Sequence, residues 1–241
     1  YDQWLTTHQP FHWLAEFYEI VHERGGFDVI IGNPPYVEYR QVKKRYSIKN
    51  YFTENCGNLY AYVIENSTSL LNSYGFIGMI VQLPIVCTDR MIPLQQHMKS
   101  NYEINYFTTF DDRPGKLFDG LEHIRATIFV SKKLENNCRV IYTSKYHRWY
   151  TEFRSFLFEN IVFHKNSYDF PGAIPKIGTN IHEKIFESIS HMNSISQFLN
   201  NQNKNLIYFH NAPQYWIRAT TFVPYFWNER DGQKPSQQIK T

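Results

Sequence analysis

The pattern of apolar and polar positions is clearest between residues 25 and 36. Gly25-Gly26 breaks the chain, and an apolar, β-branched run follows at Phe27 to Ile31. A short run of this kind between turn residues predicts a strand buried on both faces. The strand must end at Gly32-Asn33-Pro34-Pro35, because two successive prolines cannot donate to a sheet ladder.

The next hundred residues alternate between helical and strand-like patterns. Apolar residues recur at helical spacing from Asn58 to Leu71, and residues 91–99 favour a second helix. The continuous or alternating apolar runs predict three more strands, at 76–81, 103–110 and 126–132. Strands that alternate with helices of this length indicate an α/β fold with a mainly parallel sheet.

The pattern changes near residue 135. Aromatic and polar residues then mix without a clear period as far as Asn160, apart from a predicted helix at 181–192 and strand-like sequence at 206–226. We therefore expect a boundary at about residues 135–150, which divides the chain into regions 1–140 and 141–241.

The residues with the clearest chemistry are Asn33-Pro34-Pro35-Tyr36, at the predicted carboxyl end of a strand, where α/β proteins bind ligands. Proline restricts the preceding residue to extended conformations, so this elbow is rigid. The Asn33 side-chain oxygen and the Pro34 carbonyl can accept both hydrogens of an exocyclic amine on an aromatic ring, and Tyr36 can stack on that ring. The amine nitrogen can then attack the sulfonium methyl group of S-adenosylmethionine without a strong general base. The alternative is an ordinary turn stiffened by proline.

At these residues the sequence resembles gamma-class adenine-N6 DNA methyltransferases, whose catalytic motif is N-P-P-Y. Three segments around the motif follow the order found in the large type IIG restriction-modification and BREX-like members. These segments are FDVIIGNPPYV, Asn58-Leu59-Tyr60-Ala61-Tyr62 and the glycine-containing run at 75–81. The resemblance covers residues 11–135 well and the remainder more loosely. It implies that residues 1–140 form the catalytic half of a Rossmann-like methyltransferase sheet. Residues 141–241 would then form a linker and part of a mixed α/β target-recognition region.

The resemblance also implies roles for single residues. Asn33 and Pro34 would hold the amino group of a flipped-out adenine, and Tyr36 would stack on it. Phe118 occupies the place of a second aromatic residue beside the base, although it could also be an ordinary loop aromatic packed on the sheet. Pro35 and Val63 would contact S-adenosylmethionine, unless Val63 is simply a core residue. His12 stands where the family often has an acid.

The glycine-rich cofactor loop of the family is not found in this sequence. We therefore expect an internal fragment that binds the cofactor poorly and has little activity by itself. Three alternatives remain open: methylation of a glutamine amide in protein, methylation of RNA, and a non-catalytic DNA-binding or interaction fragment. We found no nuclease signature.

Double-stranded DNA is the expected partner because a basic segment directly follows the motif. It contains Arg40, Lys43, Lys44, Arg45 and Lys49, with no acidic residue between them. Such a cluster can bind phosphates beside an extruded base, although a solvated surface loop is the alternative. Aromatic and basic residues also mix at 147–150 and 208–218, where we expect contacts to bases.

Composition adds mainly exclusions. The formal net charge is +3 among 241 residues, so overall charge says little about partners. Three widely separated cysteines argue against a disulfide framework or a zinc site, and we expect no metal. No signal peptide opens the sequence and its longest apolar run is too short to span a bilayer, which predicts a cytoplasmic location. The oligomeric state and the DNA site recognised cannot be predicted.

Overall fold

The fold was analysed in a computed structural model, in which two compact units span Tyr1–Ser188 and Ile189–Thr241. The structure describes residues 2–8, 13–45, 47–118, 124–134, 139–168, 170–193, 208–210, 219–221 and 239–240. The α-helices of the described residues are α1 (Asp2–His8), α2 (Trp13–Glu16), α3 (Tyr18–His22), α4 (Tyr39–Val42), α5 (Leu59–Leu70), α6 (Ile92–Asn101) and α7 (Asn180–Ser190).

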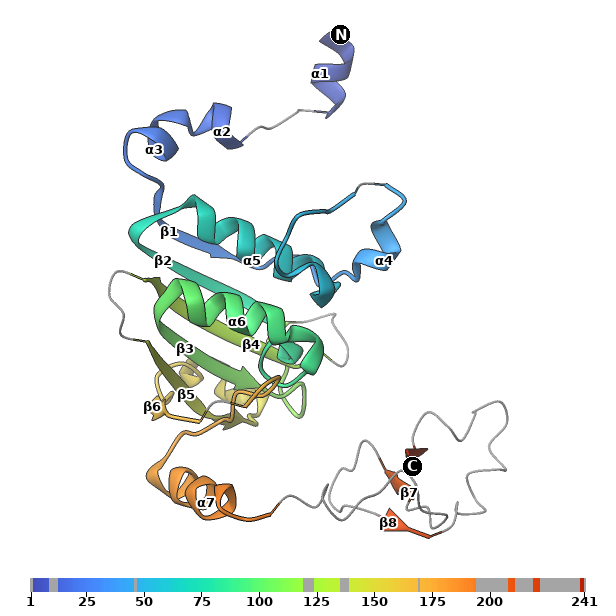
Figure 1. Ribbon diagram of the computed structural model, residues 1–241, viewed down its shortest axis with the longest axis vertical. Helices are drawn as coiled ribbons and strands as arrows, with labels where there is room; N and C mark the ends of the chain where they lie inside the picture. The colour runs from blue at the N-terminus through green and yellow to red at the C-terminus, as the bar shows by residue number, and fades with distance from the viewer. Residues whose placement is uncertain are drawn as a thin grey trace. The chain divides into compact units, whose positions relative to one another are not determined.

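The first unit is built on a six-stranded mixed sheet (Figure 1). Its order is β1-β2-β4-β3-β5-β6, and β1, β2, β3 and β5 run in the same direction. The strands are β1 (Phe27–Gly32), β2 (Leu71–Gln82), β3 (Tyr102–Phe110), β4 (Ala126–Lys133), β5 (Val140–His147) and β6 (His164–Asn166). The predicted α/β class is therefore confirmed. The sheet continues past residue 140, whereas the assignment of 141–241 to a target-recognition region stays a prediction.

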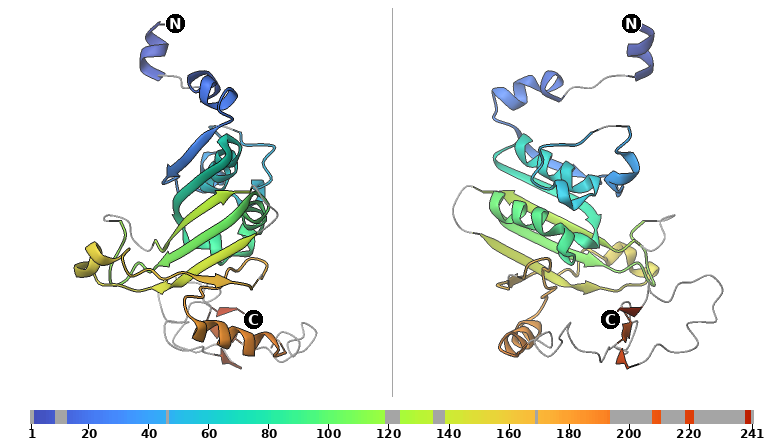
Figure 2. Two further views of the ribbon diagram at one scale, coloured as in Figure 1. Left: turned by 90° about the vertical axis from the view of Figure 1, so that its left-hand side faces the viewer. Right: turned by 45° about the vertical axis from the view of Figure 1, so that its right-hand side comes forward.

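Helices α5 and α6 lie side by side over one face of the sheet (Figure 1). The main core lies beneath them and includes Tyr60, Ile64, Ile77, Leu94 and Phe129. Because side chains alternate along a strand, Phe110 and Ile128 face the opposite side, where they pack with Trp149, Leu157 and Ile161. Trp149 precedes the short 3-10 helix η4 (Thr151–Phe156), and Leu157 and Ile161 follow it. This segment covers part of the second face of the sheet (Figure 2).

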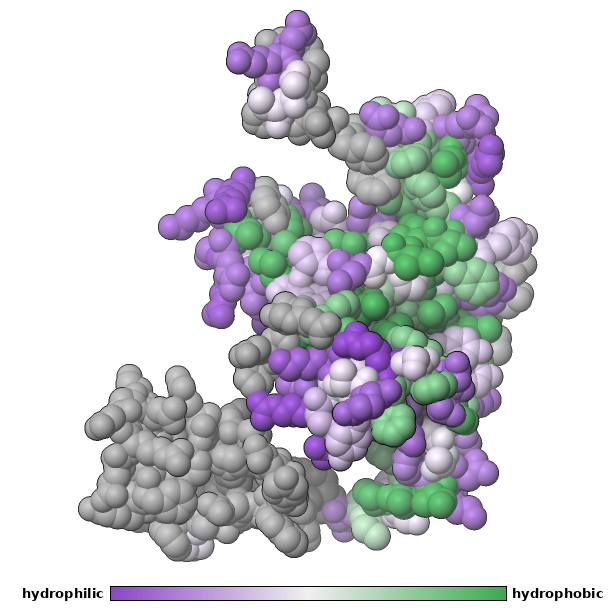
Figure 3. All heavy atoms as spheres, turned by 180° about the vertical axis from the view of Figure 1, so that it is seen from behind, coloured by the Kyte–Doolittle hydropathy of each residue, from purple (hydrophilic) through white to green (hydrophobic). Residues whose placement is uncertain are grey.

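The prediction that β1 is buried on both faces is wrong. Ile30 packs against the main core, but Val29 and Ile31 point the other way and are 54% and 82% exposed. Strand β1 is the edge of the sheet, and among the described residues nothing covers its second face. Phe76 and Val130 are also exposed there, and hydrophobic side chains gather on this face when it is seen from behind (Figure 3).

The predicted helices at 58–71, 91–99 and 181–192 and the predicted strands at 76–81, 103–110 and 126–132 are confirmed, whereas the boundary at about 135–150 stays a prediction. Helix α5 begins where predicted, because the Asn58 side chain accepts from the Tyr60 N–H at 3.4 Å and caps the first turn. The segment 37–57, between the motif and α5, contains one helical turn, α4, and the 3-10 helix η1 (Glu54–Cys56). In the second unit, β8 (Ala219–Thr220), β7 (Tyr208–His210) and β9 (Ile239–Lys240) form a small antiparallel sheet. No helix in the described part of the chain is long and apolar enough to span a membrane.

Candidate functional site

The elbow at the end of β1 holds the four predicted motif residues. Pro34 is buried, while Asn33 and Pro35 are exposed and Tyr36 is half-buried. Burial of the Pro34 ring fixes the middle of the elbow, and its neighbours face outward. Among the described residues, neither the Asn33 side chain nor the Pro34 carbonyl has a hydrogen-bond partner. Two oxygen acceptors are therefore free at adjacent positions.

Tyr36 is held in one position. Its ring packs against the main core, and its hydroxyl donates to the Ile80 carbonyl near the end of β2 at 3.0 Å. Burial raises the pKa of Tyr36 to about 12, so the hydroxyl stays protonated and keeps this bond at any physiological pH. Because the hydroxyl already donates its hydrogen bond to Ile80, a ligand would contact Tyr36 through its ring.

The chain that leaves the elbow is tied to the start of α5. The Leu59 N–H donates to the Val37 carbonyl and the Tyr39 N–H to the Gly57 carbonyl, both at 2.9 Å. Gly57 has a φ of 63°, a left-handed conformation that glycine adopts without strain. These backbone bonds place the elbow and the helix that follows it in a fixed relation.

An ion pair reinforces this tie. Arg90, in the 3-10 helix η3 (Asp89–Met91), donates to both carboxylate oxygens of Glu38 at 2.9 and 2.8 Å. The Asn58 amide donates to the same carboxylate at 3.2 Å. The Arg90 hydrogen bonds, helped by Asn58, hold the pKa of Glu38 below its usual value despite partial burial. Sequence reasoning missed this pair, since nothing in either residue's neighbourhood signals a partner 52 positions away.

The predicted cofactor residues lie in different settings. Val63, on α5, is 36% exposed and lines a pocket of about 390 Å³. The other lining residues come from β1 and α5 and are Phe27, Val29, Ile30, Ile31, Asn66, Ser67 and Leu70. Pro35 is exposed at the elbow and is not part of this lining, and His12 lies outside the described residues. The structure thus makes Val63 a pocket residue rather than a core residue.

Phe118 lies half-exposed after β3, in the connection to β4. That connection leaves the same edge of the sheet as the elbow, because β1 and β3 point the same way. Its two ends are joined by Arg125 and Asp111, whose Nε and Oδ1 atoms are 3.1 Å apart. Although burial opposes it, hydrogen bonds from Asp112, Tyr146 and Arg125 lower the pKa of Asp111. The Arg125 carbonyl accepts from Leu83, directly after β2.

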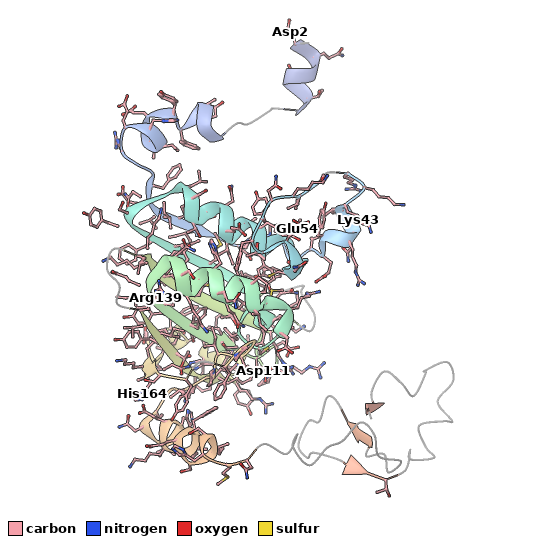
Figure 4. The ribbon with its side chains drawn as sticks, in the orientation of Figure 1. Asp2, Lys43, Glu54, Asp111, Arg139 and His164 are labelled. Atoms are coloured by element: carbon pink, nitrogen blue, oxygen red, sulfur yellow. The ribbon has the colours of Figure 1, made fainter. Side chains whose placement is uncertain are left out.

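The basic segment projects into solvent. Arg40, Lys43, Lys44, Arg45 and Lys49 are all exposed, and Lys43 points away from the sheet (Figure 4). None of these five cations forms an ion pair with another described residue. Two tyrosines that flank the segment have structural contacts: the Tyr39 hydroxyl accepts from the Ile48 N–H at 3.0 Å, and Tyr51 packs edge-on against Tyr62.

The aromatic and basic residues at 147–150 are not all available for base contacts. Trp149 is buried in the second core, and His147 is buried and stacked with Phe110, although Arg148 and Tyr150 are exposed. Within 208–218, only 208–210 belong to the described residues. Cys56 and Cys87 are free thiols, Cys138 lies outside the described part, and no described cluster of His, Cys, Asp or Glu could hold a metal ion.

Comparison with known proteins gives one family and several relatives. Residues 2–118 match the Eco57I restriction-modification methylase family. A protein of Methanocaldococcus jannaschii, provisionally named a type II restriction enzyme and methyltransferase, is 37% identical over 73 residues, which are 30% of this chain and 6% of that protein. The type II methyltransferase M.BstVI of Geobacillus stearothermophilus is 26% identical over 115 residues, which are 44% of this chain and 19% of that protein. The chain thus spans a small part of both relatives.

The matches among solved structures include a restriction-modification enzyme and a second complex with DNA. A nuclease-deletion mutant of the Type ISP enzyme LlaGI with a DNA substrate mimic gives a TM-score of 0.48 at 18% identity, covering 62% of this chain and 15% of the other. The DrdV–DNA complex gives 0.47 at 16% identity, covering 62% and 18%.

Proposed function

Because residues 2–118 match the Eco57I restriction-modification methylase family, we propose that this chain carries the catalytic elbow of a DNA adenine-N6 methyltransferase. The enzyme transfers a methyl group from S-adenosylmethionine to N6 of an adenine extruded from double-stranded DNA. It serves a restriction-modification or related phage-defence system. The observation that carries the proposal is the elbow itself: among the described residues the oxygen acceptors of Asn33 and Pro34 have no hydrogen-bond partner, and the hydroxyl of Tyr36, in the same elbow, is held by Ile80.

The elbow matches the chemistry of an amino group on a flat ring. The Asn33 amide oxygen and the Pro34 carbonyl each accept one hydrogen of the adenine amine, which draws electron density onto nitrogen. The Tyr36 ring, anchored through its hydroxyl to Ile80, offers a rigid surface on which the base stacks. No carboxylate or imidazole has to remove the proton first, so positioning and preorganised acceptors supply the rate.

The residues around Val63 fit the adenine part of S-adenosylmethionine. A volume of about 390 Å³ falls within the range of small-molecule sites, and its walls are mainly apolar with Asn66 and Ser67 as polar groups. Val63 and Pro35 provide apolar contacts to the cofactor. S-adenosylmethionine, when bound, supplies an electrophilic methyl group on sulfur, while the elbow orients the nitrogen that accepts it.

The basic segment supports DNA as the substrate. Five exposed cations, which form no ion pair with any described residue, directly follow the catalytic elbow and can bind phosphates. Extrusion of a base costs unstacking and unpairing energy, which phosphate contacts beside the base help to offset. Phe118 contributes a second aromatic contact to the extruded adenine.

The test is methyl transfer by the intact protein from labelled S-adenosylmethionine to genomic DNA that contains no methylated adenine. We expect Asn33→Ala to reduce the rate by roughly 10²–10³-fold, as loss of one preorganised hydrogen-bonding group does in other active sites. Asn33→Asp should retain part of the activity because it keeps an acceptor. Asn55→Ala, an exposed asparagine in η1, is the matched control and should leave the rate unchanged.

The destination of the label separates the alternatives. Label in protein or RNA, and not in DNA, would favour methylation of a glutamine amide or of RNA. DNA binding without transfer to any acceptor would favour a non-catalytic module. Either result would refute the proposed function.

A further inference from the structure

We propose that Arg154 is a positioning residue that holds the backbone in front of Phe118, so that this ring is in place when the adenine is extruded. The inference rests on the proposed function. Its evidence is a set of contacts between the segment around η4 and the connection from β3 to β4, which are separated by more than thirty residues in the chain.

Arg154 binds the two carbonyls that directly precede Phe118. Its Nη1 donates to the Leu117 carbonyl at 3.1 Å, and its Nη2 donates to the Lys116 carbonyl at 2.6 Å. A planar guanidinium presents these donors in a fixed fork, so two bonds to successive carbonyls define the direction of the chain as well as its position. The direction of the chain at 116–117 sets where the next residue, Phe118, can place its ring.

The Arg154 guanidinium is itself held in place by Trp149. It lies 5.5 Å from the centre of the Trp149 ring, in a cation–π contact, and Trp149 is only 6% exposed in the second core. The chain also follows this indole closely at Gly115, whose N–H donates to the Trp149 carbonyl at 2.8 Å. A Cβ on Gly115 would lie 2.8–2.9 Å from Trp149 atoms, so only glycine allows this approach.

The ends of the connection are held by other contacts. The Asp111 N–H donates to the His147 carbonyl at 2.9 Å, and the Asp111–Arg125 ion pair joins the end of β3 to the start of β4. Arg154 therefore holds the connection between these two ends, at the residues next to Phe118. Its loss should free residues 116–118 and leave the sheet intact, which separates a positioning role from a general role in folding.

The first arm of the test is hydrogen exchange in the intact protein, with Arg154→Ala, Arg154→Lys and the control Glu152→Ala. Glu152 is exposed in the same 3-10 helix. We expect Arg154→Ala to raise exchange of the Gly115 N–H, which donates to the Trp149 carbonyl, about tenfold and to leave β3 unchanged, with Arg154→Lys in between, since lysine lacks the fork. Unchanged exchange at Gly115, or equal loss of protection throughout β3, would overturn the proposal.

The second arm is methyl transfer to genomic DNA free of methylated adenine, measured at saturating and limiting DNA. Arg154→Ala should lower kcat/KM about tenfold through Phe118. The same substitution should have little further effect in a Phe118→Ala background. Additive losses in the double variant, or wild-type kinetics for Arg154→Ala, would refute the role of Arg154. Absence of transfer by the wild type would instead refute the proposed function.

Discussion

Gly25 and Gly26 offer a sharp test of the local structure that leads into β1 and the elbow. Both have positive φ, 74° and 125°, so alanine is strained at either position. Their surroundings differ. A Cβ on Gly25 would meet nothing within 4 Å, whereas a Cβ on Gly26 would lie 2.5 Å from the Leu70 carbonyl oxygen and 2.6 Å from the Asn72 nitrogen. Those atoms belong to the backbone at the junction of α5 and β2, so they cannot turn aside as a side chain can.

The expected magnitudes follow from these two differences. An alanine in the left-handed backbone conformation destabilises the folded state by about 1–2 kcal/mol. The lower conformational entropy of the unfolded chain offsets roughly 0.4–1 kcal/mol of this, so Gly25→Ala should lower the free energy of unfolding by about 1 kcal/mol. Overpacking adds about 1–3 kcal/mol, so Gly26→Ala should cost about 3 kcal/mol. The difference between the two variants, about 2 kcal/mol, is the quantity to measure.

Hydrogen exchange of peptides that cover 27–32 and 76–82 measures this difference locally, without assuming that the two units unfold together. A difference of about 2 kcal/mol corresponds to roughly thirtyfold faster exchange in Gly26→Ala than in Gly25→Ala. Equal exchange rates in the two variants would refute the close approach between Gly26 and the α5–β2 junction.

Three further predictions concern the supports of the site. Burial raises the pKa of Glu65, but hydrogen bonds from Thr53 and the Phe52 and Thr53 backbone lower it below the usual value. The stabilisation is therefore present above the ordinary carboxyl pKa and lost as pH falls through the lowered value. The protection of the 52 and 53 amides, measured as the exchange rate relative to the intrinsic rate at the same pH, should fall with acid in the wild type and show no such pH dependence in Glu65→Gln. A double-mutant cycle of Glu38→Gln and Arg90→Gln should give a coupling energy of about 1 kcal/mol in chemical denaturation, and zero coupling would contradict the bidentate geometry. Tyr36→Phe should destabilise by about 1 kcal/mol in the same assay yet keep methyl transfer within a few-fold, because the ring and not the hydroxyl meets the base; a loss as large as that of Asn33→Ala would show that the hydroxyl takes part.

The elements that sequence predicted well are those with local signals. Asn58 caps α5 because its own side chain reaches the helix's first turn, and the prolines end β1 wherever the strand is placed. The motif Asn33-Pro34-Pro35-Tyr36 could likewise be located, since its rigidity is a property of consecutive residues.

The features that sequence could not predict depend on which elements become neighbours. An apolar run does not reveal that β1 is an edge strand, so the exposure of Ile31 was missed. Trp149 looked like a candidate base contact because its neighbours are basic and aromatic, but the fold buries it against Phe110. Arg90 and Arg154 act through partners that are distant in sequence, at Glu38 and Leu117.

The most direct test of the central claim is the chemical identity of the methylated base. DNA treated with the intact protein and labelled S-adenosylmethionine is digested to nucleosides, which are separated and identified by mass spectrometry. An elbow whose two acceptors hold an amine on a purine predicts that the label is found in N6-methyladenine and is absent after Asn33→Ala. Label in a methylated cytosine, or in N6-methyladenine at the wild-type rate after Asn33→Ala, would contradict it.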